Sequence, residues 1–143
     1  MVIFDIKNLN IWFDSTQALK DISMQVLPHE ILSVIGPSNS GKTTFLRMLN
    51  RLNDLNTRFK MNGDVRFDGQ DIKKVDVELL RRKIGMVFAL PLPLPLSIFE
   101  NVAYGMKMAG VNNRKRLAQV VENALKQAYL WEEVKGRMNE SAF

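Results

Sequence analysis

Residues 36–43 read Gly36-Pro37-Ser38-Asn39-Ser40-Gly41-Lys42-Thr43. The run matches the phosphate-binding pattern G-x-x-x-x-G-K-S/T at every position. Before it, residues 31–35 are short, apolar and rich in β-branched side chains, which is typical of a buried parallel strand. After it, apolar residues recur at helical spacing as far as Leu52. Strand, glycine-rich loop and helix in this order aim backbone N–H groups at a phosphate, so the sequence predicts a nucleotide-binding α/β fold.

The residue types in the loop suit the same chemistry. Gly36 and Gly41 permit backbone angles that a Cβ atom would forbid. Lys42 supplies a mobile positive charge for the outer phosphates, and Thr43 supplies a hydroxyl for Mg²⁺. The alternative is a Gly/Ser-rich turn that matches the pattern by chance. The predicted nucleotide-binding residues of the loop are Gly36, Pro37, Ser38, Asn39, Ser40, Gly41, Lys42, Thr43 and Thr44.

Composition and length limit the possible protein classes. The chain has 143 residues, of which 46% are hydrophobic, so we expect one compact domain spanning residues 1–143. It has no cysteine, which excludes disulfides and thiolate metal sites. No signal peptide is visible, so an intracellular location is the default expectation. The net charge of +5 favours an ordinary solvated surface, with phosphate ligands or an anionic membrane surface as the alternatives.

The remaining pattern alternates strands and helices. Prolines at every second position make residues 89–96 a loop. Ser97 and Glu100 have the spacing of a capping box, which starts a helix that Gly110 ends. We expect further strands at residues 2–11, 21–27, 63–67 and 84–88, and further helices at residues 76–83 and 114–128.

Several segments beyond the loop resemble one family. These are residues 8–13 with 17–22, 51–55, 85–88, 97–105 and 130–135. On them the chain resembles the N-terminal half of an ABC-transporter ATPase, and within that superfamily the ATP-binding subunit of the phosphate-specific importer. The resemblance implies an α/β P-loop NTPase of ABC-ATPase type, with an N-terminal antiparallel β portion and incomplete at the C-terminus. It also places Phe13 at the aromatic position that stacks on adenine, for which ordinary packing is the alternative.

The function implied by the resemblance is that of a subunit energising phosphate import. Its cofactors are ATP and Mg²⁺. Its partners are transmembrane permease subunits, with a homodimer in the full-length family, and its location is peripheral, at the cytoplasmic face of the membrane. A rival interpretation is a non-catalytic nucleotide-binding fragment or a degenerate, truncated gene product. A third, a basic nucleic-acid-binding domain, is disfavoured because the basic runs at residues 81–83 and 114–116 lack interleaved aromatics, so we expect no nucleic-acid partner.

Two departures from the family pattern limit what the resemblance carries over. The glutamine that follows Val87-Phe88 in the family is Ala89 here, and the polar positions of the next segment are leucines. The sequence given also stops at Phe143, where the family's signature motif is expected to begin. We therefore assign no catalytic residue and leave ATP hydrolysis by this chain open. The sole histidine, His29, is interpreted as a surface residue, Glu100 as a helix cap, and Asp68 and Asp71 as turn residues.

Overall fold

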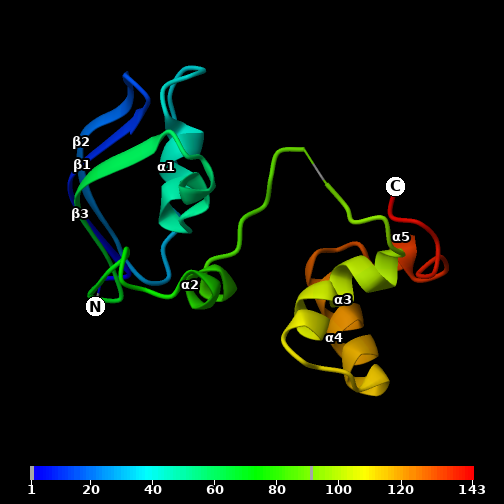
Figure 1. Cartoon of the computed structure of the whole chain (residues 1–143). Coiled ribbons are helices and arrows are strands. Elements are labelled where there is room, and N and C mark those ends of the chain that lie inside the picture. Colours follow the sequence, from blue (N-terminus) through cyan, green and yellow to red (C-terminus); the bar gives the residue numbers. More distant parts are fainter. Residues whose placement is uncertain (1, 91) are drawn as a thin grey trace. The chain divides into compact units, whose positions relative to one another are not determined.

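The computed structural model describes residues 2–90 and 92–143, and these form two compact units. The units are Met1–Met86 and Val87–Phe143 (Figure 1). Pro91, part of the predicted proline loop, lies outside the described residues; the flanking positions 89, 90 and 92–96 form no helix or strand. The expectation of one domain over residues 1–143 stays a prediction.

The first unit is built on a four-stranded antiparallel sheet with strand order β2-β1-β3-β4. The strands are β1 (Phe4–Phe13), β2 (Thr16–Val26), β3 (Phe59–Phe67) and β4 (Gln70–Asp71). The predicted strands at residues 2–11, 21–27 and 63–67 are therefore confirmed, with the last beginning four residues earlier than expected.

The central strand β1 carries most of the core but does not alternate regularly. Phe4 and Ile6 are buried, and the next buried side chain is Leu9 rather than a residue two positions on. The register shifts at this point because Asn8 adopts a left-handed φ of 50°. Opposite it lies Gly63, where a Cβ atom would stand 2.6 Å from the Asn8 carbonyl oxygen. The bulge leaves Leu9 and Ile11 in the same core as Phe4 and Ile6.

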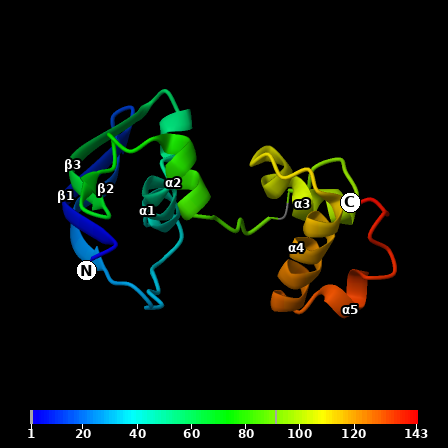
Figure 2. The same cartoon turned by 90° about the horizontal axis from the view of Figure 1, so that it is seen from below.

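Two α-helices and one 3₁₀ turn accompany this sheet. They are α1 (Lys42–Leu49), η1 (Leu52–Leu55) and α2 (Val77–Lys83). Figures 1 and 2 show α1 against one face of the sheet, into which it buries Phe45 and Met48. The helix predicted to run to Leu52 ends at Leu49, because Arg51 has a left-handed φ of 57°.

Two predicted strands are wrong. Residues 31–35 and 84–88 run as irregular backbone, and Ile31, Ile35 and Val87 are 98%, 90% and 99% exposed. A strand needs a neighbour whose N–H and C=O groups pair with its own. In the ranges that the structure describes, every named strand pair is antiparallel and none includes these segments. The apolar residues of these segments therefore indicate a preference for β structure, but among the described residues neither segment has a neighbouring strand to pair with.

The second unit consists of helices. They are α3 (Ile98–Met108), α4 (Arg114–Gln127) and α5 (Trp131–Val134). The Ser97 hydroxyl accepts from the Glu100 backbone N–H at 3.2 Å, which confirms Ser97 as the N-cap. The Glu100 carboxylate instead accepts from Lys107 at 3.1 Å, so the reciprocal half of the predicted capping box, with Glu100 as a cap, is wrong.

Helix α4 packs beside α3 through one narrow face (Figures 1 and 2). Leu117, Val121 and Leu125 are buried, whereas Ala124 and Ala128 of the predicted stripe are exposed. Over the described ranges, each helix is too short or too polar to cross a bilayer.

Candidate functional site

The glycine-rich segment forms a tight loop that ends at the first residue of α1. The Ser40 N–H donates to the Pro37 carbonyl at 3.4 Å, and Asn39 between them has a φ of 62°. Gly41 follows with a φ of 87° and serves as the N-cap position of α1. A Cβ atom on Gly41 would lie 2.6 Å from both the Ala18 carbonyl oxygen and the Leu19 Cδ2 atom. The loop thus rests directly on β2, and only glycine fits at that contact.

The helix start presents backbone donors beside the loop. Phe45 N–H donates to the Gly41 carbonyl at 2.8 Å, so the N–H groups of the residues before it have no partner from this helix. The first turn of α1 holds no acidic residue. The positive end of the helix dipole therefore faces the loop without a competing carboxylate.

A polar cavity of about 250 Å³ lies at this helix start. It is lined by Ala18, Asn39, Ser40, Gly41, Lys42, Thr43 and Thr44. A second, more apolar cavity of about 320 Å³ includes Gly36, Pro37, Ser40, Gly41 and Lys42 in its lining. Of the nine loop residues predicted from the sequence, these two cavities bring together all but Ser38.

Lys42 curls back over the loop that precedes it. Its Nζ atom donates to the carbonyl oxygens of Gly36 at 2.9 Å and Pro37 at 2.7 Å, and lies 3.5 Å from the Ser40 hydroxyl. All three acceptors are neutral, and among the described residues no carboxylate forms an ion pair with Lys42. A full positive charge is thereby held inside the loop without compensation, as an anion site requires.

The same residues can be tested against the ligand that the loop pattern predicts. A triphosphate fits the donor set, because a curled loop, a helix start and one uncompensated ammonium group all favour negative oxygens. The Thr43 hydroxyl is a single oxygen, and Mg²⁺ prefers six. Within the described ranges no group of three or more metal-ligating side chains occurs. Magnesium here would therefore depend on phosphate oxygens and water for its other ligands.

Phe13 lies in a different setting from the loop. It is the last residue of β1, and its ring centroid is 5.8 Å from that of Phe59, with the planes tilted by 46°. Neither cavity beside the loop includes Phe13 in its lining. The contact with Phe59 is the ordinary packing named above as the alternative, and adenine stacking on Phe13 stays a prediction.

The residues set aside as non-catalytic have partners or exposures of their own. Asp68 pairs with Lys83 at 3.3 Å, and Asp71 accepts from the Lys73 backbone N–H at 3.0 Å. His29 is exposed, with a φ of 61°.

Sequence reasoning missed one residue that positions the site. Asn53 is only 5% exposed, and its Nδ2 atom donates to the Thr44 carbonyl at 2.8 Å. It therefore ties η1 to the first turn of α1, next to Thr43. The sequence alone does not single out Asn53, because a buried asparagine and a solvated one look alike in a sequence. The signal available is the Arg51-Leu52-Asn53-Asp54-Leu55 segment, one of those that resemble the phosphate-importer family.

The match to known proteins agrees with this geometry. The ABC transporter family model matches residues 19–141, and the chain belongs to that family. A solved structure described as a bacterial Atm1-family ABC exporter with ATP bound superposes with a TM-score of 0.78 over 96% of this chain and 23% of that chain, at 24% identity. This likeness concerns the fold alone. It confirms the expected ABC-ATPase fold class with an N-terminal antiparallel sheet.

More specific relatives are proteins named phosphate import ATP-binding protein PstB. Those of Bacteroides thetaiotaomicron and Bacteroides fragilis are 47% identical to this chain over 99% of its length. The chain spans 57% of the length of each of these relatives. The resemblance to the ATP-binding subunit of a phosphate importer is thus confirmed at the level of sequence similarity.

Proposed function

We propose that this chain belongs to the ATP-binding subunit of an ABC importer and binds Mg-ATP through residues 36–44. The observation that carries the proposal is the Lys42 ammonium group, held against the Gly36 and Pro37 carbonyls at the start of α1 with no anionic partner in the described part of the chain. The alternative of a chance Gly/Ser turn does not account for a glycine at position 41 that packs against β2.

Each loop residue has a role in this proposal. Backbone N–H groups at the start of α1 hold the inner phosphates, and Lys42 leaves its carbonyl partners to contact the outer phosphates. Thr43 contributes its hydroxyl to Mg²⁺, and Asn53 keeps the first turn in place through Thr44. Phe13 stacks on the adenine. When bound, ATP would supply the free energy that the transporter converts into work.

The proposed cargo is inorganic phosphate. Its support is the 47% identity to relatives named as phosphate import proteins. In this role the subunit works as a homodimer with transmembrane permease subunits, at the cytoplasmic face of the membrane, and has no nucleic-acid partner.

A second candidate function is nucleotide binding without hydrolysis. The observation that favours it is Ala89, which stands where the family places a glutamine that approaches the metal and the attacking water. A methyl group donates and accepts no hydrogen bond, so it cannot orient water. We expect ATP turnover by the purified chain to be lower by on the order of 10² to 10⁴ than that of an enzyme with a complete catalytic set. Steady-state phosphate release measures this; robust release that Lys42→Ala abolishes would contradict it.

Nucleotide binding itself is tested by calorimetry. Lys42→Ala removes a charge-assisted contact worth about 1.5–3 kcal/mol, so Mg-ATP affinity should fall roughly tenfold to a hundredfold or more. The matched control is Lys115→Ala, which removes an exposed lysine from α4 in the other unit and should leave affinity unchanged. Equal affinity in the wild-type chain and in Lys42→Ala would refute the proposed site.

A further inference from the structure

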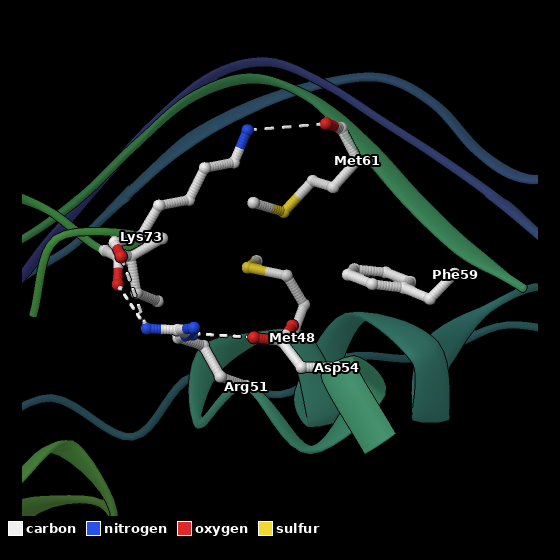
Figure 3. A pocket seen from close by; sticks show the side chains of 7 residues that line it. Met48, Arg51, Asp54, Phe59, Met61 and Lys73 are labelled. Carbon is white, nitrogen blue, oxygen red and sulfur yellow. Dashed lines mark hydrogen bonds and ion pairs between the residues drawn. The ribbon is translucent and has the colours of Figure 1, made fainter. Parts of the chain in front are cut away.

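A third cavity, of about 230 Å³, lies apart from the phosphate loop (Figure 3). It is formed by the end of α1, the η1 turn, the start of β3 and the segment after β4. It shares no lining residue with the two cavities at the loop.

The floor of this cavity is apolar and soft. Met48 and Ile72 are 2% and 0% exposed, and Met61 and Phe59 complete the floor. Figure 3 shows the thioethers of Met48 and Met61 facing each other, with the Phe59 ring at one side. The Phe13 ring packs against the Phe59 ring, with 5.8 Å between the two ring centroids. Methionine side chains adapt to differently shaped apolar groups, so this floor accepts either an alkyl or an aryl body.

The charges at the cavity are unequal. Arg51 is satisfied, because its Nε pairs with Asp54 at 2.8 Å and its Nη1 donates to the Val75 carbonyl at 3.0 Å. Lys73 makes one long hydrogen bond, from Nζ to the Met61 carbonyl at 3.4 Å, and has no carboxylate partner among the described residues. The cavity is lined by two basic side chains, Arg51 and Lys73, and one acidic side chain, Asp54, so its net charge is +1. Because Arg51 pairs with Asp54, this charge resides on the flexible ammonium group of Lys73.

From this combination we propose that the cavity binds a small organic monoanion. Its apolar body occupies the floor between Met48, Met61 and Phe59, and its carboxylate accepts from Lys73. A cavity smaller than the ~300 Å³ of drug-sized pockets limits the ligand to roughly ten non-hydrogen atoms. Inorganic phosphate does not fit this chemistry, because it has no apolar surface to place against the floor and its hydration would be lost there.

The test uses hexanoate as the probe and the methyl signals of ¹³C-methyl-methionine as the readout. Met48→Leu and Met61→Leu assign two of the eight methionine signals by their disappearance. We expect saturable shifts of these two signals with a dissociation constant on the order of millimolar, the range for so small a ligand. Hexanol, which keeps the apolar body and lacks the charge, should bind about fivefold more weakly.

The matched pair of variants is Lys73→Gln and Lys74→Gln, two exposed neighbours of which only Lys73 lines the cavity. Lys73→Gln should weaken hexanoate about fivefold and leave hexanol unchanged, whereas Lys74→Gln should behave as wild type. Equal hexanoate affinity in all three proteins, or shifts spread over all methionine signals without saturation, would overturn the proposal. Calorimetry with Mg-ATP on the same variants measures nucleotide binding at the phosphate loop separately. A failure of the proposed nucleotide site can therefore be distinguished from a failure of the proposed monoanion site.

Discussion

At the scale of single residues, the phosphate loop depends on one glycine more than on the others. Gly41 combines a left-handed φ of 87° with a contact that leaves no room for a side chain. Gly69 has a similar φ of 80° but nothing within 4 Å of the position of a Cβ atom. An alanine at position 69 would therefore add backbone strain alone, whereas an alanine at position 41 would add both backbone strain and a steric clash.

Gly69→Ala should lower the free energy of unfolding by about 1 kcal/mol, which is the strain of an L-residue in the left-handed region. Gly41→Ala should cost about 3 kcal/mol, because β2 and the loop must also separate, and it should abolish Mg-ATP binding. Urea unfolding and calorimetry measure the two effects. Equal losses in both variants would mean that the contact with Ala18 and Leu19 yields without cost.

At the residue scale the sequence pattern predicts Lys42 and Thr43 as site residues, because the chemistry of a phosphate loop is encoded in consecutive residues. The structure places both at the polar cavity beside the start of α1, and their contacts with ATP and Mg²⁺ stay a prediction. Asn53 was missed, because its partner is the Thr44 carbonyl and a backbone acceptor leaves no trace in a sequence.

At the scale of elements, α2 holds the end of the phosphate-loop helix. Arg81 donates from Nε to the Asn50 carbonyl at 3.2 Å and from Nη2 to the Arg51 carbonyl at 2.9 Å. These carbonyls follow the last turn of α1, where helices leave acceptors without partners. The guanidinium group also lies at the negative end of that helix. It therefore fixes α1 at the end opposite to the loop.

We predict that Arg81→Met lowers the free energy of unfolding of the first unit by about 1–2 kcal/mol, since two part-buried carbonyls lose a charged donor. Its neighbour Arg82 lies in the same helix and is exposed to solvent. Arg82→Met should therefore change the free energy of unfolding by no more than about 0.5 kcal/mol. Urea unfolding followed by Trp12 fluorescence, in a Trp131→Phe background, isolates the first unit. Indistinguishable midpoints for the two arginine variants would contradict this role.

Elements were predicted well where their signal is local and poorly where it is not. The cap at Ser97 and the apolar face of α4 follow from neighbouring residues, and both appear. The helix α1 ends three residues before the predicted Leu52, at a left-handed Arg51 whose guanidinium group donates to carbonyls in residues 72–75, contacts that a local pattern does not predict. The bulge at Asn8 depends on Gly63 in another strand and was equally invisible.

At the scale of the whole molecule, the two segments wrongly predicted as strands expose large apolar side chains to solvent. Residues 31–35 expose Ile31 and Ile35, and residues 84–88 expose Val87 and Phe88. Both segments have the apolar and β-branched composition typical of strands. A strand also needs a second segment to pair with, and the composition of one segment does not show whether that partner exists. Unpaired backbone groups and exposed β-branched side chains together invite association with another chain.

We therefore predict that the isolated chain associates with itself and binds a fluorescent apolar dye. Replacing the two most exposed isoleucines of residues 31–35, in the double variant Ile31→Ser and Ile35→Ser, should reduce both effects. Its free energy of unfolding should change by less than about 0.5 kcal/mol, because these side chains lose no burial. Leu55→Ser, which removes a 73% exposed leucine outside these segments, is the matched control and should leave association unchanged. Concentration-dependent light scattering measures the association. If the wild-type chain stays monomeric at every concentration and binds no dye, the prediction is wrong. Residues 31–35 would then be covered in solution by pairing with another segment of the same chain.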